Sequence, residues 1–245
     1  MTLTSIIIPT YNALGLLRSC VDSIRAYTTE PYEIIVVDNA SEDGTDSYCR
    51  SNHIKFISLP DNRGFPIACN IGLLMASGDE LLLLNNDVIV SQGWLSNLRS
   101  ALYSAPDIGI VGPVTNYASG RQQVKTEYVG VLGYHEAAKR ANKPNPLKWM
   151  ETKRLVGLCF LLKRELLTSV GLLDERYSPG HYEDDDYCYR ARLSGYRLII
   201  AGDCLVHHEG SASFKQLYHS GLQELVERNR NVFMDKWHVN PAYFI

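Results

Sequence analysis

Apolar runs alternate with stretches of helical periodicity through the first half of the chain. Short apolar runs predict strands at residues 3–8, 33–37, 54–59 and 80–84, and the first run ends at Pro9. Apolar positions at helical spacing predict helices at residues 14–27, 41–51 and 65–77, with Ser41 as the expected N-cap of the second. Because strands and helices alternate with short connections, we expect an α/β fold with a mostly parallel sheet flanked by helices.

The regular alternation fades after Pro113. Residues 115–153 are polar and contain several glycines and prolines, so we expect mostly loops there. Further along, the pattern predicts strands at residues 155–162 and 196–201 and helices at residues 164–170, 187–194 and 217–237. No linker separates these parts, so we expect a single domain over residues 1–245, with a nucleotide-type half at 1–113 and an irregular half at 114–245.

Polar residues follow three of the predicted strands. These are Pro9-Thr10-Tyr11-Asn12, Asp38-Asn39 and Asn85-Asn86-Asp87. If the strands are parallel, their carboxyl ends line one crevice, which is where open α/β sheets bind ligands. Asp87 is then placed to hold Mg²⁺ or Mn²⁺, and Asp38 can accept a ring N–H of uracil, thymine or guanine, or a ribose hydroxyl. Either aspartate fits an ordinary turn equally well.

Two loop segments offer groups for a phosphate. Arg63 in the segment Asp61-Asn62-Arg63-Gly64 could neutralise a phosphate charge, and Gly64 could permit close approach of the backbone. The same residues are typical of an ordinary turn. Lys215, with Ser211 and Ser213 before it, is a weaker candidate for contact with phosphate.

The second half contains an acidic cluster, Glu183-Asp184-Asp185-Asp186, directly before a predicted helix. Acidic side chains favour a helix N-terminus, but crowded carboxylates also raise one another's pKa, as a general base near neutral pH requires. Asp184 is our candidate base, with Glu183 beside it. His207 and His208 close the last short strand, where neighbours face opposite ways, so we expect one of them to reach the crevice as a metal or diphosphate ligand; an ordinary surface histidine fits the pattern as well.

Composition and charge narrow the class of protein. A net charge of −3 gives no support for nucleic-acid binding. The cysteines are not spaced as CxxC and fit a reducing compartment; with no signal peptide and no long apolar run, the sequence predicts a cytoplasmic protein. Lysines and arginines between residues 139 and 154 could meet an acidic acceptor or a membrane surface, or form a solvated basic face.

The ordered set of motifs resembles glycosyltransferase family 2. The matching segments include residues 6–12, 36–45, 62–65 and 70–72, the Leu84-Asn85-Asn86-Asp87 form of the DXD metal motif, and residues 171–175, 183–188 and 208–214. The resemblance implies a GT-A fold, with a nucleotide-sugar-binding half and an acceptor-binding catalytic half. It also implies inverting transfer of a sugar from a UDP, dTDP or GDP donor to a glycan or lipid-linked glycan of surface polysaccharide.

The resemblance also assigns roles to residues. Thr10, Tyr11, Asp38 and Arg63 would hold the nucleotide, and Asp184 would be the base. Asp87 would ligate Mg²⁺ or Mn²⁺, with Asn86 beside it and His208 joining. Because Asn85 and Asn86 replace a fuller acidic motif, a single carboxylate remains, and metal affinity is expected to depend on the bound diphosphate.

Other functions stay open at this stage. A sugar nucleotidylyltransferase needs a glycine-rich basic loop after the first strand, and residues 9–12 are not one. The remaining alternative is an inactive module that binds a nucleotide sugar. The presence of Asp87, Asp184 and His208 argues against this alternative. Peripheral contact with a membrane stays open as well.

Overall fold

The computed structural model describes residues 2–210 and 221–244. The strands in that part are β1 (Thr4–Thr10), β2 (Tyr32–Asp38), β3 (Lys55–Ser58), β4 (Glu80–Leu84), β5 (Val88–Ile89), β6 (Ile108–Thr115), β7 (Trp149–Thr152), β8 (Cys159–Lys163) and β9 (Arg197–His208). The helices are α1 (Leu14–Tyr27), α2 (Thr45–Ser51), α3 (Phe65–Met75), α4 (Trp94–Leu102), α5 (Gly130–Ala141), α6 (Arg164–Val170), α7 (Glu183–Leu193) and α9 (Leu222–Trp237).

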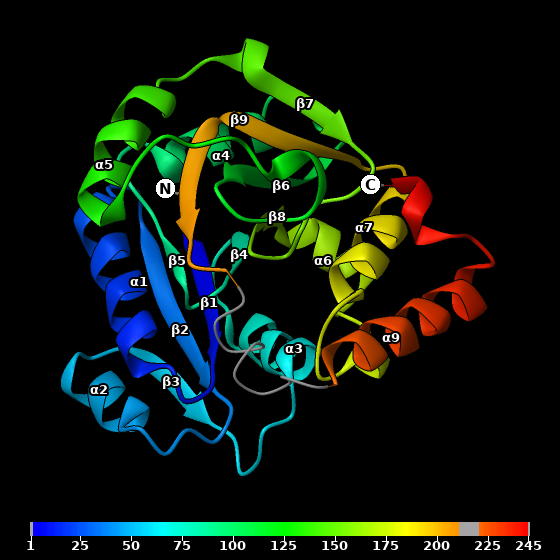
Figure 1. Ribbon diagram of the computed structural model, residues 1–245, viewed down its shortest axis with the longest axis horizontal. Coiled ribbons are helices and arrows are strands. Elements are labelled where there is room, and N and C mark those ends of the chain that lie inside the picture. The colour runs from blue at the N-terminus through cyan, green and yellow to red at the C-terminus, as the bar shows by residue number, and fades with distance from the viewer. Residues whose placement is uncertain (1, 211–220, 245) are drawn as a thin grey trace.

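One sheet forms the centre of the molecule (Figure 1). Its order is β3-β2-β1-β4-β8-β6-β9-β5, and β7 pairs with β9 beside this path. β3, β2, β1 and β4 are parallel, and so are β6 and β9, whereas β8 runs antiparallel to both β4 and β6. The predicted α/β fold with a mostly parallel sheet is confirmed.

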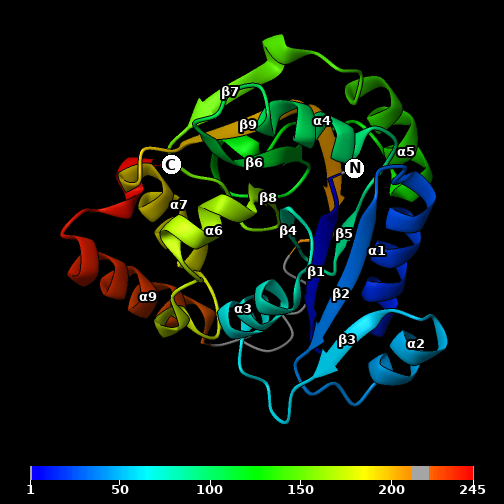
Figure 2. The same cartoon turned by 180° about the vertical axis from the view of Figure 1, so that it is seen from behind.

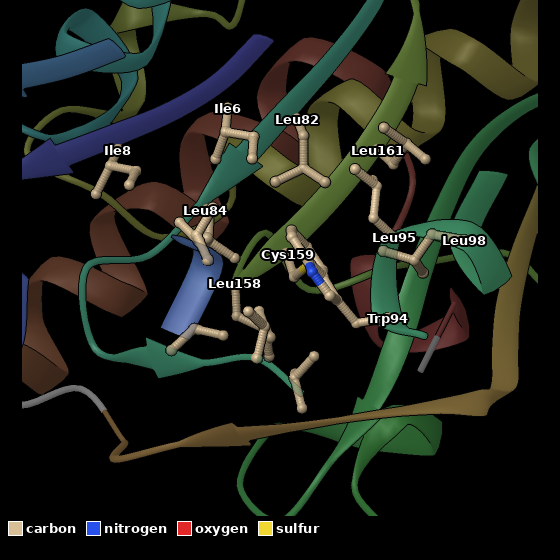
Figure 3. Packing of buried hydrophobic residues seen from close by; sticks show 14 of the residues in the cluster. Ile6, Ile8, Leu82, Leu84, Trp94, Leu95, Leu98, Leu158, Cys159 and Leu161 are labelled. Carbon is tan, nitrogen blue, oxygen red and sulfur yellow. The ribbon is translucent and has the colours of Figure 1, made fainter. Parts of the chain in front are cut away.

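Helices cover both faces of the sheet, as the two opposite views show (Figures 1 and 2). Successive strand residues point to opposite faces, so Ile6 and Ile8 pack under α1 and α4, while Ile7 packs under α3. Figure 3 shows the first of these clusters, which includes Leu82 of β4 and Trp94 of α4. Burial on both faces explains why the strands read as continuous apolar runs.

The first strand continues through Pro9, although we expected it to end there. Pro9 pairs with Val37 of β2, but on the other side the pairing of β1 with β4 stops at Ile7. Beyond Ile7 no β4 partner requires a backbone N–H, so a proline is tolerated at this position. The strand therefore reaches Thr10 and carries it to the sheet edge.

The second helix begins later than predicted. It starts at Thr45, and its N-cap position is Gly44 with φ +88°, so Ser41 is not the cap. The Asp43 carboxylate instead accepts a hydrogen bond from the Thr45 backbone N–H at 3.2 Å. The Ser41 hydroxyl accepts one from the Asn12 N–H at 2.9 Å, which joins two loops at the sheet edge.

The region predicted as loops contains regular structure, so that expectation was wrong. Residues 115–153 include α5 and β7, and β6 runs through Pro113. Within α5 only Tyr134 and Ala138, one turn apart, are buried, and the glycines at 130 and 133 in its first turn are residues typical of loops. No helix in the described ranges is long and apolar enough to cross a membrane.

A glycine in α3 sets how closely that helix packs on the sheet. A Cβ at Gly72 would lie 2.2 Å from Cγ2 of Ile7. We expect Gly72→Ala to lower the free energy of unfolding by about 1–3 kcal/mol, because the overpacked strand must shift. A matched substitution, Gly15→Ala in α1, meets no atom within 4 Å and should leave stability unchanged or raise it by up to about 1 kcal/mol. Thermal melting of both variants checks this, and equal melting temperatures would contradict it.

Candidate active site

Three strand ends meet at one edge of the sheet, as the sequence predicts. The Asn86 side-chain amide donates a hydrogen bond to the Thr10 hydroxyl at 2.8 Å, and the Asn39 backbone N–H donates to the Thr10 carbonyl at 2.8 Å. All three residues are buried. Pro9 lies buried in β1, and the half-buried Tyr11 follows the strand. Parallel pairing thus assembles a polar crevice from distant segments.

Asp87 and His208 are brought together where the short strand β5 pairs with the end of the long strand β9. β5 pairs antiparallel with the end of β9, with Val88 opposite His208 and Ile89 opposite His207. The Glu209 N–H then donates to the Asp87 carbonyl at 3.1 Å. Because neighbours on a strand face opposite ways, His208 turns towards Asp87, whereas His207 contacts Tyr128 on the other side.

The pair fits a divalent cation. Nε2 of His208 lies 3.1 Å from Oδ1 of Asp87, and apart from this contact neither buried atom has a hydrogen-bond partner among the described residues. Nδ1 of His208 is 2.8 Å from the Tyr117 carbonyl, an arrangement that directs the Nε2 lone pair towards Asp87. Histidines that bind metals commonly donate their other ring N–H in this way.

The protein supplies few ligands at this point. No group of three or more His, Cys, Asp or Glu side chains with metal-binding geometry occurs within residues 2–210 and 221–244. Burial lowers the pKa of His208, but the neighbouring Asp87 carboxylate outweighs it, so the net shift is upwards. A cation between the two side chains would replace the shared proton, since metal ligands are deprotonated.

Two of the residues predicted to bind the nucleotide, Asp38 at the end of β2 and Asn12 after β1, also make hydrogen bonds within the protein. Asp38 is 1% exposed, and its carboxylate accepts hydrogen bonds from the Ser41 N–H at 3.0 Å and from the Ser58 hydroxyl at 3.1 Å. A carboxylate has further lone pairs on each oxygen, so Asp38 retains acceptor capacity for a ligand. The side chain of Asn12 accepts from the Glu42 N–H at 2.8 Å and holds the adjoining loop.

The Arg63-Gly64 turn contacts the second half of the chain. The Arg63 N–H donates to Oδ1 of Asn39 at 3.2 Å, and the Arg63 side chain is exposed. A Cβ at Gly64 would lie 2.6 Å from Cα of Pro179. Gly64 therefore permits a close approach between two loops of the protein.

The acidic cluster forms the first turn of α7, and its carboxylates point in different directions. Asp184 accepts hydrogen bonds from the Gly157 N–H at 2.9 Å and from the Asp185 N–H at 2.9 Å. Asp185 makes an ion pair with Nε of Arg154 at 2.6 Å. We had grouped Arg154 with the exposed basic residues, but its side chain is only 14% exposed.

Burial shifts the proton affinity of two of these groups. It raises the pKa of Glu183 well above its usual value, and the negative charge of Asp184 adds to the effect. Oε2 of Glu183 is buried without a hydrogen-bond partner in the described part of the chain. Burial and Asp184 also raise the pKa of Asp185 to about 7, although Arg154 opposes this. Burial is the larger cause of both shifts, and the neighbouring negative charge adds to it.

Asp186 serves the fold. Its buried carboxylate makes ion pairs with Arg190 at 2.8 Å and with Lys236 at 2.6 Å, and it accepts a hydrogen bond from the Trp237 indole at 2.8 Å. These contacts fasten α9 to α7. Nearby, the Asn229 side-chain amide contacts the carbonyls of Tyr177, Gly180 and His181 at 2.7, 2.7 and 2.9 Å. The last helix therefore supports the loop before Asp184.

One cavity joins the two groups of candidate residues. It has a volume of about 550 Å³ and is lined by Glu183 and Asp184 from α7 and by Asn85 and His208 from the crevice. Asp87 does not line the cavity itself but contacts His208, which does. A volume of this size is typical of a small-molecule site. Tyr117, Arg154 and Gly157 also line it, and of these three only Gly157 was not indicated by the sequence pattern. Lys215 lies outside the described residues.

Solved structures share this architecture. The mannosyltransferase PcManGT from Pyrobaculum calidifontis, in complex with GDP-Man and Mn²⁺, superposes with a TM-score of 0.64 at 24% identity over 84% of this chain and 56% of that one. GalNAc-T7 with UDP, GalNAc and Mn²⁺ gives 0.67 at 19% identity over 85% and 44%. At such identities the likeness shows the fold, which is the GT-A fold of glycosyltransferases.

Sequence comparison shows the family. The profile of Glycosyl transferase family 2 matches residues 5–171, and the chain belongs to that family. The uncharacterized protein y4gI of Sinorhizobium fredii is 31% identical over 86% of this chain and 25% of its own length. O-antigen biosynthesis protein RfbC of Myxococcus xanthus is 30% identical over 85% and 17%. The chain thus spans a quarter or less of these two relatives.

Proposed function

We propose that the chain is an inverting glycosyltransferase that uses a divalent cation and a nucleoside-diphosphate sugar. The observation that carries the proposal is the single cavity lined by Asp184 and Glu183 on one side and by His208, which touches Asp87, on the other. A sugar donor seated there would have its diphosphate near the cation ligands and its reacting carbon within reach of a base. The named complexes of GDP-Man and of UDP with Mn²⁺ in structural neighbours support this placement.

The donor nucleotide would lie along the strand ends. Asp38 and Arg63 offer an acceptor and a cation for base or ribose and phosphate, with Thr10, Tyr11 and Asn86 between them. Pro9, Asn12, Asn39 and Gly64 shape this wall through the loop contacts described above. Mg²⁺ or Mn²⁺, held by Asp87 and His208 and by diphosphate oxygens, would stabilise the charge that develops on the leaving diphosphate.

Asp184 is the proposed base. Gly157 and Asp185 hold its carboxylate through backbone N–H groups, which fix its position towards the cavity. A base on the face opposite the leaving group removes the proton of the acceptor hydroxyl as that oxygen attacks, and this single displacement inverts the configuration at the sugar carbon. Glu183, with its raised pKa, would remain protonated beside it and so add no second negative charge.

The acceptor is proposed by analogy with relatives. RfbC is named for O-antigen biosynthesis, and another relative, from Staphylococcus aureus, is a poly-β-1,6-N-acetyl-D-glucosamine synthase with 24% identity. A glycan or lipid-linked glycan of a surface polysaccharide is the corresponding acceptor for this chain. The cytoplasmic location predicted from the sequence remains part of the same proposal.

Nucleotide-dependent thermal stabilisation tests the proposal. We expect one of UDP, GDP and dTDP, together with Mn²⁺, to raise the melting temperature by about 5–10 °C at a ligand concentration near 100 times Kd. EDTA should remove most of the shift. Hydrolysis of the matching nucleotide sugar in Mn²⁺ then measures turnover.

The outcomes separate the alternatives. Stabilisation without turnover of any matching donor would favour an inactive nucleotide-sugar-binding module. No stabilisation by any of the nucleotides, with or without metal, would contradict the donor site altogether. Incorporation of a nucleoside monophosphate into a sugar phosphate would instead identify a nucleotidylyltransferase.

A further inference from the structure

A second cavity lies apart from the candidate active site. It is a groove of about 630 Å³ between α5, the 3₁₀ turn Pro146–Lys148, β7 and β9. Its walls are largely apolar, with Val114, Val124, Ala137, Met150 and Leu205 among the lining residues. The residues assigned above to donor, metal and base do not line it. The groove is therefore free for another kind of ligand.

The segment that forms the groove carries unusually exposed apolar side chains. Val129 and Leu147 are 95% exposed and Leu132 is 85% exposed, the highest values among large apolar residues in the described ranges. Leu147 also lines the groove itself. Exposed apolar side chains gathered on one segment beside an apolar groove mark an interaction surface.

The same segment is strongly basic. Residues 121–154 contain eight lysines and arginines and three glutamates, although the whole chain has a net charge of −3. Lys125, Arg140 and Lys148 line the groove, together with one acidic residue, Glu127. These three basic side chains are exposed, and none makes an ion pair with another residue in the described part of the chain. Their charge is available to an anionic partner.

The groove and the candidate site are linked through β9. Tyr128 lines the groove, and its hydroxyl lies 2.8 Å from Nδ1 of His207, the neighbour of His208. The Tyr134 hydroxyl from α5 donates to the Leu205 carbonyl at 3.2 Å in the same strand. A partner bound at the groove would therefore sit next to the strand that carries His208.

We propose that this face, formed by α5 and the turn Pro146–Lys148, docks on a membrane surface that contains anionic phospholipid. Leu132, Leu147 and Val129 would enter the apolar layer, while Lys125, Arg140 and Lys148 meet the phosphate headgroups at the groove rim. The combination of exposed leucines with unpaired basic side chains matches the chemistry of such an interface, where both apolar burial and charge contribute. The proposal does not depend on catalysis, and its test needs no turnover.

Vesicle flotation tests the docking. We expect the chain to float with vesicles of phosphatidylcholine and phosphatidylglycerol, and to float poorly with phosphatidylcholine alone or in high salt. Arg140→Ala with Lys148→Ala should weaken binding about 25-fold, since each basic side chain near the surface contributes a factor of about five. Leu132→Ser with Leu147→Ser should weaken it by at least about tenfold.

Matched variants elsewhere provide the control. Arg50→Ala in α2 and Leu74→Ser in α3 remove an exposed cation and a leucine that is 71% exposed, and both should float like the wild type. Circular dichroism and melting temperature check that all variants fold. Failure of the wild type to bind anionic vesicles would overturn the proposal. So would equal losses in the α5 and control variants, because binding would then lack a defined face.

Discussion

Replacing Asp184 with asparagine should reduce sugar transfer by about 10²–10⁴-fold, the contribution typical of a general base. The amide has nearly the same shape, but it cannot take a proton from the acceptor hydroxyl. It can still accept one of the two backbone hydrogen bonds, from Gly157 or Asp185, so the cavity wall should persist. Affinity for the nucleotide should stay close to that of the wild type, as measured by calorimetry.

Glu183→Gln is the matched control for this effect. Burial already favours the protonated form of Glu183, and glutamine resembles that neutral form in size and polarity. We therefore expect a much smaller loss of turnover than in Asp184→Asn. If the two variants behaved in the reverse order, Glu183 would be the base and our assignment would be wrong.

Replacing Asp87 with alanine should abolish most metal-dependent binding of the nucleotide. Asp87 is the carboxylate of the proposed metal pair, and its Oδ1 faces Nε2 of His208 at 3.1 Å. Loss of a hydrogen-bond partner of a metal ligand lowers metal affinity by roughly 10–100-fold. Loss of a direct ligand such as Asp87 should lower the metal-dependent affinity for the nucleotide by at least as much. Calorimetric titration of the stabilising nucleotide with and without Mn²⁺ gives the measurement.

Other variants define what this result means. Asp22→Ala removes an exposed carboxylate from α1 and should leave the affinity in Mn²⁺ unchanged. His208→Ala should lower it less than Asp87→Ala, because the carboxylate and diphosphate oxygens remain. Unchanged affinity in Asp87→Ala would show that the cation, if one binds, is held elsewhere.

The sequence predicted the strands and the crevice well because their signals are local. The four leucines before Asn85 read directly as a buried strand, and the polar residues after each strand marked one edge. The hydrogen bond from Asn86 to Thr10 joins two of these strand ends directly. Parallel pairing leaves little choice in where such residues meet.

The parts that the sequence did not predict depend on distant contacts. α5 begins with the glycines at 130 and 133, which are typical of loops, and β7 is a short strand defined mainly by its pairing with β9. Arg154 pairs with Asp185, which lies far along the chain, so a pattern of neighbouring residues cannot indicate the contact. Which of the acidic residues supports α9 was equally hidden, since Lys236 and Trp237 come from the end of the chain.

The short pairing of β5 with the end of β9 makes the contact between Asp87 and His208 depend on few backbone hydrogen bonds. The ladder joins Val88 with His208 and Ile89 with His207, and one further hydrogen bond joins Glu209 to Asp87, so this short ladder is expected to fray at a lower free energy than the central strands. Fraying separates Asp87 from His208 and dismantles the cation pair. A ligand that bridges the two side chains binds only when the ladder is formed, so its binding free energy opposes this local unfolding. We therefore expect the end of β9 to become more ordered as the cation site fills.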